Sequence, residues 1–151
     1  MCARRALGQA RVCVVGVGGV GSWVVEAFAR SGVGALTLVD LDEVCVTNVN
    51  RQLPALDGGF GKFKVEELAK RVKLISPGCK VEAKTEFFNE TTYAGILSDG
   101  FEFVVDAIDN VRNKVLLIAE CGISNFANGN FAALVSLKVL HCCIVFCDVN
   151  L

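Results

Sequence analysis

Short apolar runs alternate along this chain with segments in which apolar residues recur every three or four positions. Such runs predict strands of a buried parallel sheet, and the three-and-four spacing predicts helices that cover the sheet. We expect strands at residues 12–15, 35–40, 79–83 and 101–110, and helices at residues 19–31, 65–75, 89–97 and 110–124. The alternating order predicts an α/β fold with a doubly wound, mostly parallel sheet and helices on both faces.

The helix expected at residues 19–31 concentrates its apolar side chains at helical spacing. We expect its buried face to consist of Val20, Trp23, Val24, Ala27 and Phe28. This assignment leaves Glu26 and Arg30 to the solvent, and Gly32 ends the helix.

A glycine-rich turn, GVGGVG at residues 16–21, joins the first expected strand to this helix. Gly16 permits the tight turn, Gly18 lets the backbone approach a ligand closely, and Gly21 lets the helix lie near the strand. The N–H groups of the helix, from Gly19 onward, then face a phosphate group. Glycine-rich turns also occur for structural reasons alone, but the place of this one between a buried strand and a helix predicts a Rossmann-like nucleotide site.

Asp40 follows the glycine turn by about twenty residues, at the carboxyl end of the second expected strand. An acid at this position accepts hydrogen bonds from the hydroxyl groups of a ribose. An alternative role for Asp40 is to cap the loop at residues 40–43. Up to this point in the chain, an NAD-dependent dehydrogenase fits as well as an ATP-binding protein.

The composition is that of a folded protein without a strong electrostatic bias. Of the 151 residues, 53% are hydrophobic and 21% are charged, with a net charge of −1, so we expect one domain and no global basic surface for nucleic acid. The amino-terminal residues include Arg4 and Arg5 but no apolar core of signal-peptide length. We therefore expect a cytoplasmic protein, or an organellar one if the source is a eukaryote.

Eight cysteines occur in the chain, and four of them stand singly in apolar segments: Cys13, Cys45, Cys79 and Cys121. We expect these four to act as small core residues in a reducing compartment. The cluster of Cys142, Cys143 and Cys147 contains no C-x-x-C pair, so no zinc site is expected there.

A group of amides and cations separates the two nucleotide alternatives. Asn48 and Arg51 lie in the segment TNVNRQ, and Lys64 stands where the next helix begins. A dehydrogenase binds the pyrophosphate of its cofactor mainly with backbone N–H groups of the protein. A triphosphate that loses a leaving group needs cationic side chains that neutralise its charge. Arg51 can donate two parallel hydrogen bonds to phosphate oxygens, and Lys64 can place a positive charge at the α-phosphate. Asn48 can bind a phosphate oxygen or a metal-bound water. Taken singly, Arg51 and Lys64 also fit solvated surface charges.

The fourth expected strand ends on acids, Asp106 and Asp109. The carboxyl ends of parallel strands meet at one edge of the sheet, so we expect Asp109 beside the glycine turn and Asp40. A carboxylate that faces a triphosphate needs a divalent cation between them, which predicts that Asp109 is a Mg²⁺ ligand. As an alternative, Asp106 and Asp109 cap the helix that follows.

Five stretches, in this order, resemble the superfamily of ubiquitin-activating enzymes and their bacterial ThiF and MoeB relatives, which adenylate carboxylates. They are GVGGVGSW from residue 16, LVDLDEV from 38, TNVNRQ from 47, G-x-x-K from 61 and DAIDN from 106. Within the superfamily, the stretches at residues 22–27 and 44–52 are most similar to the tRNA threonylcarbamoyladenosine dehydratases. The resemblance covers residues 12–121.

The resemblance implies a single nucleotide-binding domain of the ThiF type that uses ATP and Mg²⁺. It assigns the catalytic roles to Arg51, Lys64 and Asp109, with Asp109 on the metal. The nucleotide-binding set it implies is Gly16, Gly18, Gly19, Gly21, Asp40, Asp42, Asn48, Arg51, Lys64, Asp109 and Asn110. Implied partners are a tRNA with a modified adenosine as substrate, a second copy in a homodimer, and a sulfur-transfer protein.

Three other functions stay open on the sequence alone. They are adenylation of a sulfur-carrier or ubiquitin-like protein, an NAD-dependent oxidoreductase, and a nucleotide-binding fragment without catalysis. The last is motivated by residues 122–151, where the sequence departs from the superfamily pattern and we expect two strands, at about 132–139 and 142–147, rather than a membrane span. His141, the single histidine, is expected at a core or edge position of the sheet.

Overall fold

The computed structural model describes residues 6–128 and 133–136 of the chain, with side chains for residues 6–121. In this part, a five-stranded sheet runs in the order β3-β2-β1-β4-β5, and every neighbouring pair is parallel. The strands are β1 (Arg11–Val15), β2 (Ala35–Val39), β3 (Lys80–Lys84), β4 (Phe103–Asp106) and β5 (Ala133–Ser136). This strand order, with β1 at the centre, is that of the doubly wound Rossmann-like fold.

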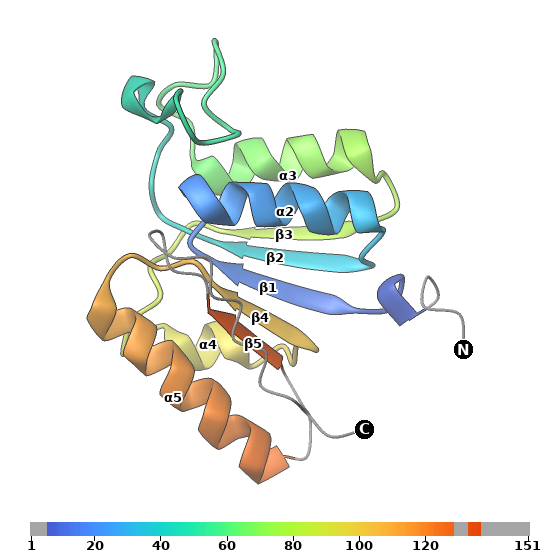
Figure 1. The fold of residues 1–151 in the computed structure, drawn as a ribbon, viewed down its shortest axis with the longest axis vertical. Helices are drawn as coiled ribbons and strands as arrows, with labels where there is room; N and C mark the ends of the chain where they lie inside the picture. Colours follow the sequence, from blue (N-terminus) through green and yellow to red (C-terminus); the bar gives the residue numbers. More distant parts are fainter. Residues whose placement is uncertain (1–5, 129–132, 137–151) are drawn as a thin grey trace.

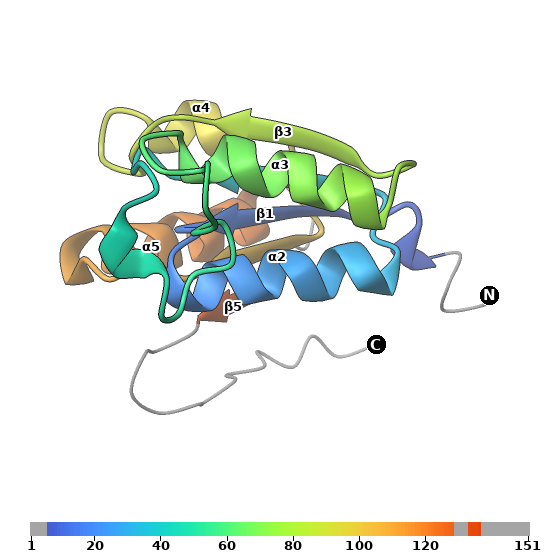
Figure 2. The same ribbon diagram turned by 90° about the horizontal axis from the view of Figure 1, so that it is seen from above.

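Helices cover both faces of the sheet, as Figures 1 and 2 show. They are α2 (Gly19–Ser31), α3 (Lys64–Ile75), α4 (Tyr93–Leu97) and α5 (Val111–Asn128), with a short 3₁₀ turn, η1 (Val46–Asn48). The helices α2 and α3 lie side by side on one face, and α4 and α5 lie on the other. None of the helices in the described ranges is long and apolar enough to cross a membrane.

The central strand β1 contributes to two hydrophobic clusters, one on each face. Val12 and Val14 pack in the cluster with α2 and α3, whereas Cys13 and Val15 pack in the cluster with α4 and α5. This confirms that the apolar run before the glycine turn is a strand buried on both faces. The predicted α/β fold with a doubly wound parallel sheet is likewise confirmed.

The buried face of α2 differs from the prediction. The buried residues of α2 are Gly21, Ser22, Val25, Glu26 and Ala29. Of the five predicted residues, Val24 and Phe28 are half-buried and pack against the core, whereas Ala27 is exposed. Trp23 is instead 57% exposed, and Glu26, which we expected in solvent, is only 8% exposed. The cause is a partner: Glu26 accepts hydrogen bonds from Arg30, one turn away, and from Arg71 of α3, so its charge is neutralised where it is buried.

Several element boundaries also shift. The fourth strand ends at Asp106, so residues 107–110 form a loop rather than a continuation of β4. The helix expected from residue 89 begins at Tyr93, because the Asn89 side chain accepts the N–H groups of Thr91 and Thr92 in a turn before it.

Two further expectations have mixed outcomes. Cys13, Cys79 and Cys121 are buried as expected, but Cys45 is exposed, because it stands in the loop after β2 rather than in a strand. The strand expected at 132–139 is present as β5. The strand expected at 142–147 lies outside the described residues, as do His141 and the three cysteines near it.

Candidate functional site

A cavity of about 650 Å³ opens at the carboxyl ends of β1, β2 and β4. Its volume is in the range of small-molecule sites, and its place is where open parallel sheets bind ligands. Ten of the eleven residues expected to hold a nucleotide line it: Gly16, Gly18, Gly19, Asp40, Asp42, Asn48, Arg51, Lys64, Asp109 and Asn110. The fold thus brings together residues that are more than 90 positions apart in the chain.

The glycine turn is shaped by steric limits at two of its positions. Gly16 has a φ of +86°, which side chains of L-residues rarely adopt, and an added Cβ would lie 2.7 Å from the carbonyl oxygen of Ala107. At Gly21, the eleventh residue, an added Cβ would lie only 1.9 Å from the carbonyl oxygen of Gly16. Gly21 therefore does not line the cavity, but it allows α2 to begin directly against the turn.

The amino-terminal end of α2 points its backbone donors toward the cavity. The first helical bond runs from the Ser22 N–H to the Gly18 carbonyl, and no side chain caps the helix. The N–H groups of the first turn therefore have no partner within the helix, and they carry the positive end of its dipole. This is an arrangement that binds phosphate oxygens.

Asp40 ties the glycine turn to the loop after β2. Its Oδ2 accepts the Val17 N–H at 2.8 Å, and its Oδ1 accepts the Asp42 N–H at 2.8 Å. Burial raises the pKa of the Asp40 carboxyl, and the two N–H donors work in the opposite direction. Each carboxylate oxygen has a second lone pair, so Asp40 can hold the loop and accept ribose hydroxyls at the same time.

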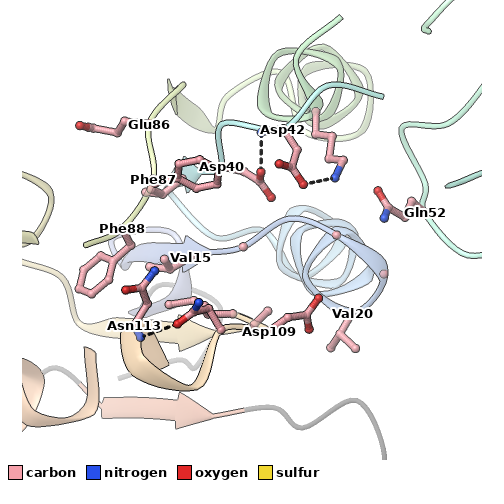
Figure 3. A pocket seen from close by; sticks show the side chains of 18 of the residues that line it. Val15, Val20, Asp40, Asp42, Gln52, Glu86, Phe87, Phe88, Asp109 and Asn113 are labelled. Carbon is pink, nitrogen blue, oxygen red and sulfur yellow. Dashed lines mark hydrogen bonds and ion pairs between the residues drawn. The ribbon is translucent and has the colours of Figure 1, made fainter. Parts of the chain in front are cut away.

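Lys64 is a buried cation at the start of α3, with 5% of its surface exposed. Its Nζ lies 2.7 Å from Oδ2 of Asp42, and a dashed line at Asp42 in Figure 3 marks this ion pair. Both residues line the cavity. A cation in the first turn of a helix lies at the positive end of the dipole, where it destabilises the helix. Lys64 is therefore poorly placed for stability, but well placed to meet an anion in the cavity.

Arg51 and Asn48 stand on the segment between β2 and α3. The Nη1 of Arg51 donates to the Thr47 carbonyl at 3.1 Å and to the Asn50 side chain at 2.9 Å. Its Cγ and Cδ lie 3.6 Å from where a Cβ of Gly19 would stand, so the arginine crosses the glycine turn. The buried Asn48 accepts the Cys45 N–H with its Oδ1 at 3.0 Å, which commits its oxygen to the loop and leaves its N–H₂ end for a ligand.

Asp109 lies in the loop after β4 and reaches the cavity near the start of α2 (Figure 3). Within the described part of the chain, its carboxylate has no hydrogen bond or ion pair. The cap of α5 is instead Asn110, whose Oδ1 accepts the Asn113 N–H at 3.1 Å. Asp106 is fully buried, accepts the Ile108 N–H at 3.0 Å and pairs with Lys114 at 2.6 Å, so it shapes the loop that carries Asp109.

The donor set fits Mg²⁺ only in combination with a phosphate ligand. Among the described residues, no three His, Cys, Asp or Glu side chains are grouped so as to hold a metal by themselves. Mg²⁺ bound to nucleotides commonly uses one or two carboxylates, with phosphate oxygens and waters as the other ligands. The carboxylate of Asp109 fits that role, and the cation would supply neutralisation of phosphate charge.

The sequence reasoning missed part of the lining. Glu86, Phe87, Phe88 and Asn89, which follow β3, form one wall of the cavity, and Gln52 forms part of another. Their composition carries no nucleotide signal, but the end of β3 lies at the same edge of the parallel sheet as the glycine turn. That rule of topology could have identified the wall after β3.

Comparison with known proteins agrees with this geometry. Residues 3–134 match the ThiF family. The chain belongs to the ThiF family. The match extends on both sides of the stretch at residues 12–121 that carries the superfamily motifs.

Individual ThiF relatives are similar over most of this chain. It is 56% identical, over 115 residues, to the tRNA threonylcarbamoyladenosine dehydratase of Haemophilus influenzae, covering 76% of this chain and 44% of the relative. It is 35% identical to the molybdopterin-synthase adenylyltransferase of Salmonella typhimurium over 118 residues, covering 78% of this chain and 47% of that protein. The chain therefore spans less than half the length of these curated relatives.

A solved structure supports the same relationship. The crystal structure of the Escherichia coli tRNA N6-threonylcarbamoyladenosine dehydratase in complex with ATP superimposes with a TM-score of 0.83 at 45% identity. The match covers 89% of this chain and 53% of that one. The fold described here is thus that of the ThiF family.

Proposed function

We propose that this chain binds ATP with Mg²⁺ in the cavity and adenylates a carboxylate. The observation that carries the proposal is that the glycine turn, Lys64, Arg51 and Asp109 line one cavity. Glycine turns occur in many nucleotide sites, but two cations and an unpaired acid around the same turn suit a polyphosphate with its metal. The ATP complex of the Escherichia coli relative supports the same nucleotide.

In the proposed reaction, a carboxylate oxygen of the substrate forms a bond to the α-phosphorus of ATP. The bond between the α-phosphorus and the bridging oxygen breaks, and pyrophosphate leaves with the electron pair. Lys64 and Arg51 stabilise the charge on the transferring and leaving phosphates, while Asp40 holds the ribose and Asp109 holds the metal. No side-chain nucleophile is required, because positioning and charge neutralisation carry the reaction.

The remaining nucleotide contacts have supporting roles in this proposal. Gly16, Gly18 and Gly19 present backbone to the phosphates, and Gly21 seats the helix. Asn48 and Asn110 offer side-chain amides at the cavity wall, and Asp42 positions Lys64.

For the substrate, we propose the threonyl carboxylate of N6-threonylcarbamoyladenosine in tRNA. Its adenylation would let the group cyclise, with release of AMP. The 56% identity to the Haemophilus influenzae dehydratase supports this choice over a sulfur-carrier protein, for which the adenylyltransferase relative is 35% identical. A homodimer, a cytoplasmic location and a sulfur-transfer partner are further parts of the proposal that the superfamily resemblance supports.

The test is turnover by the 151-residue chain itself. The chain is incubated with ATP, Mg²⁺ and tRNA that carries N6-threonylcarbamoyladenosine, and AMP and the cyclised nucleoside are measured. We expect AMP release that depends on the modified tRNA and is lost in Arg51→Ala. Pyrophosphate release with formation of an acyl-adenylate on a sulfur-carrier protein, and no turnover of tRNA, would redirect the proposal to the adenylyltransferase reaction. Binding of ATP without turnover of either substrate would reduce it to a nucleotide-binding domain.

A further inference from the structure

Gln52 carries an unusual polar group for a folded interior. Its side chain is only 8% exposed, and its Oε1 is buried without any hydrogen bond. No other buried side-chain nitrogen or oxygen in the described part of the chain lacks a partner. Buried acceptors are normally satisfied, because leaving one unpaired destabilises the folded state. Gln52 therefore costs stability in the protein without ligand.

Hydrogen bonds hold the backbone of Gln52 in the segment that borders the glycine turn. Its N–H donates to the Asn48 carbonyl at 2.9 Å, and its own carbonyl accepts the Ala55 N–H at 3.1 Å. The side-chain Nε2 lies 3.7 Å from where a Cβ of Gly18 would stand. The amide of Gln52 thus lies beside the glycine turn, and Figure 3 shows it at the cavity.

The position of Gln52 indicates which part of a nucleotide it faces. It follows Arg51 in the chain and lies at Gly18, the residue that caps the positive end of α2. In Figure 3, the aromatic side chains of Phe87 and Phe88 lie on the opposite side of the cavity from Gln52. The amide is therefore on the phosphate side of the site rather than the apolar side.

We propose that Gln52 is a binding residue for the nucleotide polyphosphate, and this inference rests on the proposed ATP site. In one orientation the amide donates its N–H to a phosphate oxygen, and in the other its oxygen accepts a hydrogen bond from a metal-bound water. In the accepting orientation, the ligand satisfies the oxygen that the protein leaves without a partner. In the donating orientation, the gain is the hydrogen bond from the amide N–H to the phosphate. Gln52 is thus retained for binding at the expense of the stability of the free protein.

The test compares stability and affinity in the full chain. Gln52→Met keeps the length of the side chain and removes its polar atoms. We expect the melting temperature of the free protein to stay equal or rise, and the dissociation constant for ATP with Mg²⁺ to increase about tenfold. Calorimetric titration and thermal unfolding measure the two quantities. Gln9→Met is the matched control, because Gln9 is the other glutamine of the chain, is exposed and does not line the cavity.

Gln52→Glu separates the two orientations of the amide. A carboxylate can still accept from a metal-bound water but cannot donate to a phosphate. If Gln52→Glu binds ATP with Mg²⁺ about as tightly as the wild type does, the contact runs through a metal-bound water. If the variant binds ATP more weakly than the wild type both with and without Mg²⁺, the amide donates directly to phosphate.

Two results would overturn the inference in distinguishable ways. Wild-type affinity in Gln52→Met together with a lower melting temperature would make Gln52 a structural residue and leave the ATP site intact. Absence of ATP binding in the wild type would overturn the proposed function and this inference with it.

Discussion

Two groups of charged side chains, both partly buried, serve different purposes in this molecule. The scaffold cluster consists of Glu26, Arg30 and Arg71, which join α2 to α3. The cavity cluster consists of Asp42, Arg51, Lys64 and Asp109 at the carboxyl ends of the strands. In the scaffold cluster, Glu26 receives bonds from both arginines at 2.6–3.1 Å. In the cavity cluster, only Lys64 and Asp42 form an ion pair among the described residues.

The difference between the clusters lies in how completely the charges satisfy one another. A buried charge that is fully paired inside the protein maintains a helix contact and has no capacity left for a ligand. The cavity cluster leaves Asp109 and part of the Arg51 guanidinium without partners in the described chain, around a cavity of ligand size. A charged side chain in a sequence motif therefore indicates a binding role only where the folded protein leaves some of its hydrogen-bonding capacity unused.

The largest expected effect is that of Lys64→Met on nucleotide binding. The variant keeps the apolar stem of the side chain and removes the cation, so the affinity for ATP with Mg²⁺ should fall about 100-fold, or about 2.7 kcal/mol. The free protein should keep its stability, because the remaining Asp42 side chain is 55% exposed and can be solvated. Isothermal titration and thermal unfolding measure both quantities.

Lys70→Met is the control for this variant. Lys70 lies on the same helix and pairs with Glu67 at the surface, away from the cavity. Its removal should leave the ATP affinity unchanged. Equal losses of ATP affinity in the two variants would mean that the lysines act through the net charge of the protein. The cavity cluster would then have no specific role in binding.

Glu26→Gln should lower stability and leave the affinity for ATP unchanged, which is the opposite of Lys64→Met. It removes the charge that two arginines share, so the free energy of unfolding should fall by about 1–2 kcal/mol, while ATP affinity stays that of the wild type. Urea unfolding measures the loss, and Glu67→Gln, whose surface partner is Lys70, should cost under about 0.5 kcal/mol. A large loss of ATP affinity in Glu26→Gln would show that the scaffold cluster also serves the site.

The scaffold cluster also predicts a dependence of stability on pH. The hydrogen bond from Arg71, and then that from Arg30, lowers the pKa of Glu26 in the folded state. The unfolded chain then binds the proton more tightly, so this contribution is complete above the ordinary glutamate pKa of about 4.3 and is lost as the pH falls through the folded-state pKa. The difference in unfolding free energy between wild type and Glu26→Gln should therefore shrink below about pH 4. A difference that stays constant from neutral pH down to pH 3 would contradict this assignment.

The smallest expected effect is that of Trp23→Phe, which tests the link between the two regions. The Trp23 Nε1 donates to the Arg51 carbonyl at 3.1 Å and so connects α2 to the cavity segment. Because this bond is exposed, its loss should reduce stability by about 0.5 kcal/mol and ATP affinity by less than about threefold. A loss of affinity as large as that in Lys64→Met would mean that Arg51 depends on Trp23 for its position.

The sequence was sufficient for the doubly wound parallel α/β fold and for most of the cavity lining, since both follow from general rules. Apolar runs and helical spacing identify the elements, and the carboxyl-edge rule places Asp40 and Asp109 near the glycine turn. The predicted buried face of α2 was partly wrong, because helical spacing identifies apolar residues alone, whereas Glu26 is buried through a partner 45 positions away. Pairing across such distances is a property of the fold and is not visible in a local pattern.

The wall after β3 and the role of Gln52 escaped prediction for related reasons. Residues 86–89 have no nucleotide motif, and they reach the cavity only because β3 is parallel to β2 at the sheet edge. Gln52 was visible within TNVNRQ, but its unpaired oxygen becomes apparent only when its surroundings are known.

The central claim is that this cavity binds ATP with its metal rather than a nicotinamide cofactor. The most direct measurement is a pair of calorimetric titrations of the wild-type chain, one with ATP and Mg²⁺ and one with NADH. We predict saturable binding of ATP with Mg²⁺ that Lys64→Met weakens about 100-fold, and no binding of NADH at the same concentrations. Tight binding of NADH without a response to ATP would contradict the account and favour an oxidoreductase.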